Sequence, residues 1–116
     1  MNLEGQAKKL SAYIGENDVY DGKALYTALV EAARTAGCAG ATVLRGIEGF
    51  GATSRIHAAH MLRMSSDLPV VVQVIDVDHR IAALAEVFKA MVGDGLVTLE
   101  EIRVVQYRGG VTGGPS

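Results

Sequence analysis

Apolar residues alternate with other residues in some stretches of this chain and recur every three or four positions in others. Residues 10–15 alternate, which predicts a strand with one buried face. Residues 22–36 place their apolar side chains on one helical stripe, which predicts an amphipathic helix. We expect Asp21 to cap the start of this helix and Gly37 to end it.

The second half of the chain repeats these patterns. Residues 41–47 predict a second strand, and residues 69–77, rich in β-branched side chains, predict a third. Asp78 is expected to cap a second helix that ends at Gly93. The last strand is expected within residues 96–107, most clearly at its end, from Ile102 onward.

The order βαββαβ is that of a ferredoxin-like α+β sandwich, in which both helices cover one face of a four-stranded antiparallel sheet. The other face is then bare. The third strand is mostly apolar on both sides, whether Val70, Val72 and Val74 or Val71, Gln73 and Ile75 face outward. We therefore expect the bare face to be covered in an oligomer.

Size and composition narrow the class of protein. The 116 residues suit one domain, with a flexible tail expected at residues 109–116 after a domain spanning 1–108. A net charge of −2 gives no basic field for nucleic acid. Cys38 is the single cysteine, so an intrachain disulfide is impossible. No apolar run approaches the roughly 18 residues of a membrane span, and a cytoplasmic protein is expected.

The best candidate for a site is the glycine-rich end of the second strand. Gly46, Gly49 and Gly51 follow the apolar run within a few residues. Glycines in such a place serve a tight turn, or they let backbone N–H groups approach a phosphate or another anion. Both interpretations stay open.

A loop without acidic residues follows, between Glu48 and Asp67. It is either a solvated loop or a positive surface that attracts an anion or a partner. Arg45 and Arg108 would add to its field if strand ends meet between subunits. The basic residues of the loop are Arg55, His57, His60 and Arg63.

Metal binding and catalysis are weaker alternatives. His57 and His60 would share a face if helical, but no neighbouring carboxylate or cysteine completes a metal site. An enzyme with a site between subunits would draw on Arg45, His57 or Asp76. No nucleophile is paired with a base at an informative spacing, so we expect no enzyme.

Several separate sequence motifs occur in the same order as in a known protein family. The chain resembles PII-like signalling proteins, and most of all the bacterial family known as domain of unknown function one-ninety, the UPF0166 type. The resemblance runs from about residue 7 to residue 108. It rests on A-T-V-L-R-G-I-E-G-F-G at 41–51, S-R-I-H at 54–57, D-L-P-V-V-V at 67–72 and G-L-V-T-L-E-E-I at 95–102.

The resemblance implies a trimeric, non-enzymatic regulator. In PII proteins a G-F-G motif, a loop and a G-D-G motif from neighbouring subunits frame clefts that hold ATP or ADP, and the loop contacts a partner such as a transporter or channel. An adenine nucleotide is thus a possible ligand. The implied ligand-binding residues are Arg45, Gly46, Gly49, Phe50, Gly51, Gly93, Asp94, Gly95 and Arg108.

The chain also departs from PII proteins. Leu96 stands where they carry a phosphate-binding lysine, and Gln106-Tyr107-Arg108 replaces their R-I-R signature. The loop of residues 52–67 has no tyrosine, so nucleotidylation of the PII kind is not expected.

Overall fold

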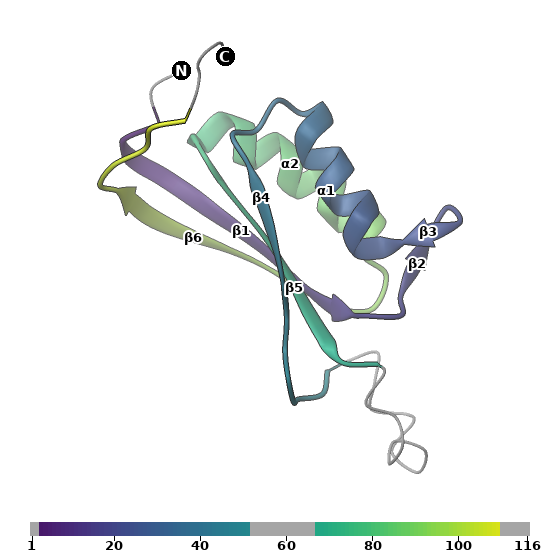
Figure 1. Cartoon of the computed structure of the whole chain (residues 1–116). Helices are drawn as coiled ribbons and strands as arrows, with labels where there is room; N and C mark the ends of the chain where they lie inside the picture. The colour runs from purple at the N-terminus through teal and green to yellow at the C-terminus, as the bar shows by residue number, and fades with distance from the viewer. Residues whose placement is uncertain (1–2, 52–66, 110–116) are drawn as a thin grey trace.

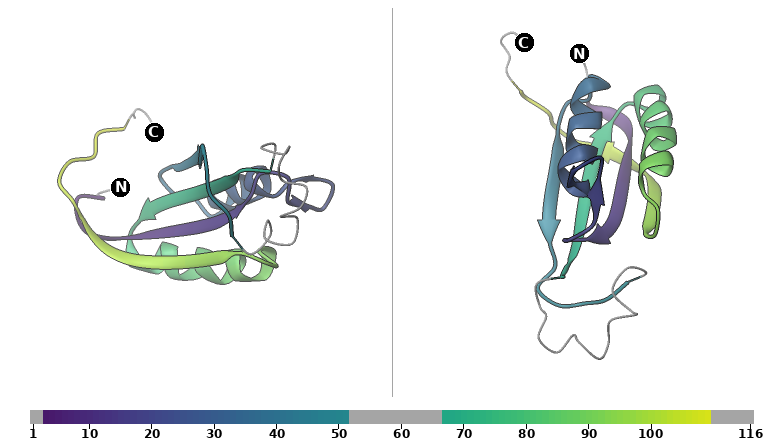
Figure 2. Two further views of the ribbon diagram at one scale, coloured as in Figure 1. Left: turned by 90° about the horizontal axis from the view of Figure 1, so that it is seen from below. Right: turned by 90° about the vertical axis from the view of Figure 1, so that its right-hand side faces the viewer.

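The computed structural model of the chain describes residues 3–51 and 67–109. Four strands form one antiparallel sheet in the order β4-β5-β1-β6, and both helices lie on the same face of it (Figure 1). Figure 2 shows the two layers from other sides. This is the expected ferredoxin-like α+β sandwich. The elements are β1 (Gly5–Gly15), β2 (Val19–Tyr20), β3 (Lys23–Ala24), α1 (Leu25–Thr35), β4 (Ala41–Arg45), β5 (Pro69–Asp76), α2 (Asp78–Met91) and β6 (Leu96–Val104).

The core lies between the sheet and the helices. Residues that face each other on neighbouring antiparallel strands share one side of the sheet. Leu10 opposite Val74 and Ala12 opposite Val72 are buried on the helix side. The helices contribute Leu25, Leu29, Ala33, Ile81, Leu84 and Phe88 to the same cluster.

Val71, Gln73 and Ile75 therefore point to the face without helices, which we call the open face. Three rows cross it, because paired residues line up from strand to strand. The first row is apolar, the second is uncharged and polar, and the third carries the ion pair Lys9–Glu100 beside Ile75. The first row consists of Leu44, Val71, Tyr13 and Leu96, and the second of Thr42, Gln73, Ser11 and Thr98.

The start of α1 differs from the prediction. Asp21 does not cap it, because Asp21 and Gly22 form the turn of the β2–β3 hairpin with φ of 51° and 83°. Two positive φ angles are the mark of a type I′ hairpin turn, which favours Asp-Gly. The N-cap is Ala24, with no side-chain cap.

The end of α1 confirms the role of Gly37. Its φ is 81°, its N–H donates to the Arg34 carbonyl at 3.0 Å, and the Cys38 N–H donates to the Ala33 carbonyl at 3.1 Å. These two hydrogen bonds form a Schellman motif, which only a residue tolerant of positive φ completes without strain.

The predicted N-cap of α2 was wrong. Val77 is the N-cap, and the Asp78 side chain accepts a hydrogen bond from Lys8 Nζ at 2.7 Å instead of capping the helix. This contact lowers the pKa of Asp78 and raises that of Lys8. The helix stops at Met91, two residues before Gly93, since Val92 is already extended.

The first and last strands also differ in length from the prediction. β1 begins at Gly5 rather than Leu10, because it has a partner strand on each side. β6 ends at Val104, which lies opposite Gly5, so residues 105–107 have no strand to pair with. The tail at 110–116 lies outside the described residues.

Candidate functional site

The two glycine-rich segments lie at the same end of the sheet. Residues 46–51 follow β4, and residues 93–95 precede β6. β4 and β6 are the two edge strands, and β5 and β1 lie between them. One chain thus presents the two segments at opposite edges of one sheet end, which we call the glycine end (Figure 1).

Packing explains two of the three glycines after β4. The Gly46 N–H donates to the Pro69 carbonyl at 2.7 Å, and a Cβ at Gly46 would lie 2.9 Å from Pro69 Cγ. Gly49 has a φ of 148° and a Cβ there would lie 3.3 Å from the same ring. A Cβ at Gly51 would meet nothing within 4 Å. The tight-turn interpretation therefore accounts for Gly46 and Gly49, and steric contact leaves Gly51 unexplained.

Two large apolar side chains stand out of this segment. Ile47 is 93% exposed and Phe50 is 83% exposed. They lie directly before the loop of residues 52–67, for which the sequence left open a solvated loop or a positive surface.

The Gly93-Asp94-Gly95 segment has one glycine that the fold needs. A Cβ at Gly95 would lie 2.8 Å from the Tyr13 carbonyl oxygen and 2.9 Å from Val92 Cγ1. A Cβ at Gly93 would meet nothing within 4 Å. Gly95 lets the chain enter β6 against β1, whereas Gly93 has no such role.

Arg45 is paired with an acid at the glycine end. Its guanidinium donates to Glu16 Oε2, and the Glu16 side chain is only 19% exposed. The Glu16 backbone N–H in turn donates to the Leu68 carbonyl at 2.8 Å. Because the pair links β4 to the start of β5 through the turn after β1, Arg45 has a structural role, and its charge is partly balanced before any ligand arrives.

Carboxylates gather around the same sheet end. Asp18 Oδ2 accepts a hydrogen bond from the Gly15 N–H at 2.9 Å. Burial raises the pKa of Asp18, that hydrogen bond acts in the opposite direction, and the nearby Asp67 and Asp94 raise the pKa further. The described part of the glycine end is therefore acidic, which the sequence pattern did not indicate.

Arg108 lies at the opposite end of the sheet within one chain. β6 has 9 residues and runs away from residues 93–95. A strand of that length spans roughly 30 Å. A role for Arg108 at the glycine end therefore requires another subunit, and it stays a prediction.

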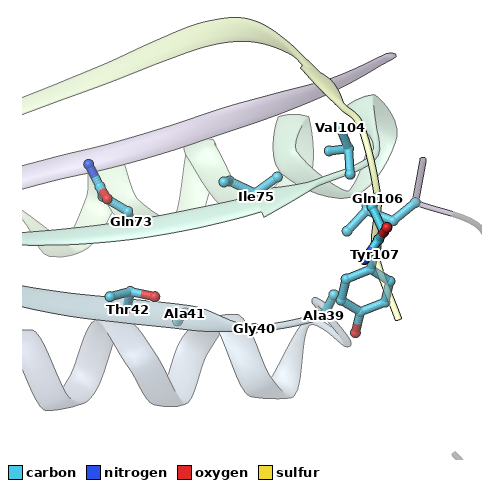
Figure 3. A pocket seen from close by; sticks show the side chains of 10 residues that line it. Ala39, Gly40, Ala41, Thr42, Gln73, Ile75, Val104, Gln106 and Tyr107 are labelled. Atoms are coloured by element: carbon cyan, nitrogen blue, oxygen red, sulfur yellow. The ribbon is translucent and has the colours of Figure 1, made fainter. Parts of the chain in front are cut away.

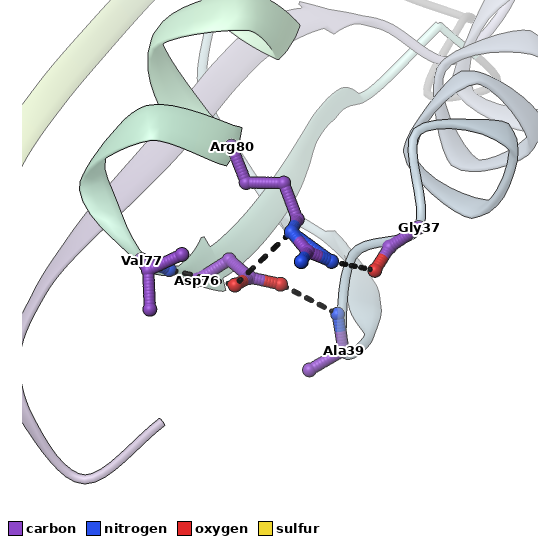
Figure 4. Close-up of polar contacts among 5 residues, drawn as sticks. All are labelled: Gly37, Ala39, Asp76, Val77 and Arg80. Atoms are coloured by element: carbon purple, nitrogen blue, oxygen red, sulfur yellow. Dashed lines mark hydrogen bonds and ion pairs between the residues drawn. The ribbon is translucent and has the colours of Figure 1, made fainter. Parts of the chain in front are cut away.

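A buried carboxylate fixes that opposite end. Asp76 is fully buried, and its oxygens accept hydrogen bonds from the backbone N–H groups of Ala39 at 2.8 Å and Val77 at 2.7 Å (Figure 4). Arg80 Nε lies 4.0 Å from Asp76 Oδ1, and Arg80 Nη1 donates to the Gly37 carbonyl at 2.7 Å. These contacts tie the turn after α1 to the start of α2, so Asp76 has a structural role at this end of the sheet.

Cys38 lies in the same turn. Burial raises the pKa of its thiol, Asp76 raises it further, and Arg80 lowers it. The thiol therefore stays protonated at neutral pH, as suits a packing residue.

The remaining candidates are Arg55, His57, His60 and Arg63, and they lie outside the described residues. Within residues 3–51 and 67–109, no group of three or more His, Cys, Asp or Glu side chains is placed to hold a metal ion. In the same ranges, neither helix combines the length and the apolar character that crossing a membrane requires.

The chain shares its fold with a protein of known structure. A solved structure with the same fold is CPII from Thiomonas intermedia K12, with a TM-score of 0.58 and 17% sequence identity. The match covers 91% of this chain and 94% of that one. In that structure CPII is bound to ADP, AMP and acetate.

Sequence comparison then gives the family. The family model described as "Uncharacterized ACR", domain of unknown function 190, matches residues 7–104. A UPF0166 protein of Aquifex aeolicus is 38% identical over 98 residues, covering 84% of this chain and 92% of the relative. A UPF0166 protein of Methanocaldococcus jannaschii is 29% identical over 105 residues, covering 90% and 94%. The chain belongs to this family.

Proposed function

We propose that the protein is a non-enzymatic, trimeric PII-like regulator that binds a small anionic ligand, with an adenine nucleotide as first candidate, in clefts between its subunits. The observation that carries this proposal is the position of residues 46–51 and 93–95 at one end but opposite edges of the sheet. Head-to-tail association around a closed ring joins one edge of each copy to the other edge of the next. Each junction then combines both segments.

The chemistry of the open face supports association with copies of the same chain. In its polar row Ser11 is already buried, whereas Thr42, Gln73 and Thr98 keep some exposure and carry hydroxyl or amide groups. Such groups both donate and accept hydrogen bonds and can therefore pair with their own kind. Lys9 and Glu100 already balance each other at 3.3 Å. Exposed Leu44, Tyr13 and Leu96 supply apolar area beside them.

The ligand is held mainly by backbone in this proposal. Leu96 carries no charge, and the charge of Arg45 is partly balanced by its ion pair with Glu16. Phosphate at the glycine end must also overcome the field of Asp18, Asp67 and Asp94. Basic side chains of the 52–67 loop (Arg55, His57, His60 and Arg63) would supply the opposing charge, which couples ligand binding to the loop.

The loop then communicates with a partner protein. Ile47 and Phe50 at its base are exposed apolar anchors of the kind that dominate the energy of protein interfaces. In PII-like proteins the partner is a transporter or channel, and we propose the same class of partner here. CPII, the protein of the same fold, is bound to adenine nucleotides, which is why these are the first ligands to test.

Calorimetric titration of the purified protein with ATP, ADP and AMP tests the ligand, and sedimentation velocity on the same samples tests the assembly. We expect trimers and saturable heat with at least one nucleotide. Trimers without heat would reject adenine nucleotides as the ligand. A monomer at all concentrations would reject the intersubunit cleft.

A further inference from the structure

The ion pair between Arg45 and Glu16 joins two segments that are 29 positions apart in the chain. Arg45 ends β4 and lies opposite Val70, which belongs to the core on the helix side of the sheet. Opposite residues share one side of a sheet, so Arg45 lies outside the open face through which we propose that copies associate. Its side chain is 61% exposed, and an anion at the glycine end can therefore reach the guanidinium.

Glu16 is fixed in its position, whereas the Arg45 side chain can turn. The Glu16 backbone N–H donates to the Leu68 carbonyl at 2.8 Å, and the Glu16 side chain is only 19% exposed. The same turn is held by Asp18, whose Oδ2 accepts from the Gly15 N–H at 2.9 Å. An exchange of partners therefore moves the long arginine side chain and leaves the carboxylate where it is.

An anion that binds Arg45 must compete with the Glu16 carboxylate. A group on the same chain competes like a separate molecule at roughly millimolar concentration. Once Arg45 turns to a ligand, the largely buried Glu16 carboxylate also loses its cation, and the ligand must offset that cost. A phosphate group is suited to this exchange because it forms strong, often bidentate hydrogen bonds with a guanidinium.

We infer that Glu16 is a built-in competitor that sets the affinity of the glycine end for anions by withholding Arg45 from them. The contact lowers the affinity of every anion that uses Arg45 by the same factor, since each displaces the same carboxylate. Phosphate-bearing ligands stay bound at ordinary concentrations, whereas single carboxylates do not. This inference rests on the proposed anion site and adds an autoinhibitory contact to it.

The test compares intact, isotope-labelled wild type with Glu16→Gln, which removes the charge and keeps the shape of the side chain. Inorganic pyrophosphate and acetate are the probes, and NMR follows the Arg45 Nε–Hε resonance during each titration. We expect Glu16→Gln to bind pyrophosphate roughly tenfold more tightly, the effect of one lost charged hydrogen-bond competitor. The affinity for acetate should rise by the same factor and stay the weaker of the two.

Two further variants separate competition for Arg45 from a general loss of negative charge. In an Arg45→Ala background, followed by calorimetry, Glu16→Gln should no longer change the affinity for pyrophosphate. Glu31→Gln is the matched control, because Glu31 pairs with Lys23 at 2.7 Å on an exposed surface away from Arg45. It should leave the affinity unchanged.

The outcomes also separate this inference from the proposed function. Equal pyrophosphate affinities of wild type and Glu16→Gln, an equal gain in the Arg45→Ala background, or no pyrophosphate binding by any variant would overturn the inference. Nucleotide binding that Glu16→Gln does not alter would overturn it and leave the proposed function standing. A gain for pyrophosphate without binding of any nucleotide would support the inference and reject adenine nucleotides as the ligand.

Discussion

The carboxylate of Asp76 accepts a hydrogen bond from the backbone N–H of Ala39 at 2.8 Å, although 37 positions separate the two residues. The same carboxylate accepts from Val77 and lies beside Arg80. This single buried side chain therefore joins the turn after α1, the end of β5 and the start of α2. It also fixes Ala39, which lines a surface pocket between the start of β4 and the end of β5 (Figure 3).

Asp76→Ala should destabilise the protein by about 2–4 kcal/mol, because it leaves buried backbone donors and a nearby guanidinium without their acceptor. Urea unfolding measures the change in the free energy of unfolding. Asp78→Ala is the control, since its pair with Lys8 is exposed and contributes little. Equal effects of the two substitutions would contradict the role assigned to Asp76.

The two glycines of the Gly93-Asp94-Gly95 segment should respond differently to alanine. Gly95→Ala forces a Cβ to 2.8 Å from the Tyr13 carbonyl oxygen, and we expect a loss of about 1–3 kcal/mol in stability. Gly93→Ala meets no atom within 4 Å and should be nearly neutral for folding. Thermal unfolding of the pair checks this order, and a Gly93→Ala variant that is the less stable one would refute it.

Asp18 should make stability depend on pH. Its pKa is raised in the folded protein, so the folded state holds the proton more tightly than the unfolded state does. Protonated Asp18 therefore contributes to the free energy of unfolding at acid pH. This contribution is lost as the pH rises from the pKa of the unfolded state through the raised pKa of the folded state. Asp18→Asn removes this loss, and Asn can still accept the hydrogen bond from Gly15.

Unfolding of wild type and Asp18→Asn should therefore be compared across pH 3 to 7. We expect the stability of the variant relative to wild type to increase as pH rises through that window. A constant difference between the two curves would show that the raised pKa does not contribute to stability.

The elements were predictable from the sequence because their signals are local. Helical and alternating spacing gave the order of the long elements, and Gly37 marked a helix end through its conformational freedom. The same local reasoning failed at Asp21, where an acid before a helix suggested a cap although Asp21-Gly22 is also a hairpin signal. The residues Asp21-Gly22 are compatible with a helix N-cap and with a hairpin turn. Only the three-dimensional structure distinguishes the two.

The site was less predictable because its features depend on distant residues. No spacing in the sequence connects Asp76 to Ala39, Arg45 to Glu16, or Asp18 to Asp67 and Asp94. The acid-free loop suggested a positive surface, whereas carboxylates from other segments make the described part of the glycine end acidic. The surface pocket beside Ala39 likewise combines the start of β4, the end of β5 and the segment after β6.

Leu96→Glu should disrupt the assembly that we propose. Leu96 is 55% exposed in one chain and lies in the apolar row of the open face. A charge there would be buried against neighbouring copies without a partner. Sedimentation velocity should show smaller species for Leu96→Glu, while Val19→Glu, on the exposed hairpin, should sediment like wild type. Trimers that tolerate Leu96→Glu would exclude the open face as the interface.

The central claim is that residues 46–51 of one chain meet residues 93–95 of the next. Cross-linking tests it directly, in a Cys38→Ser background, with one chain carrying Glu48→Cys and another carrying Asp94→Cys. The two chains are refolded together and treated with a short thiol-reactive cross-linker. We predict covalent dimers in the mixture that exceed those from either chain alone. Assembled trimers that give no excess of mixed dimers would contradict the account.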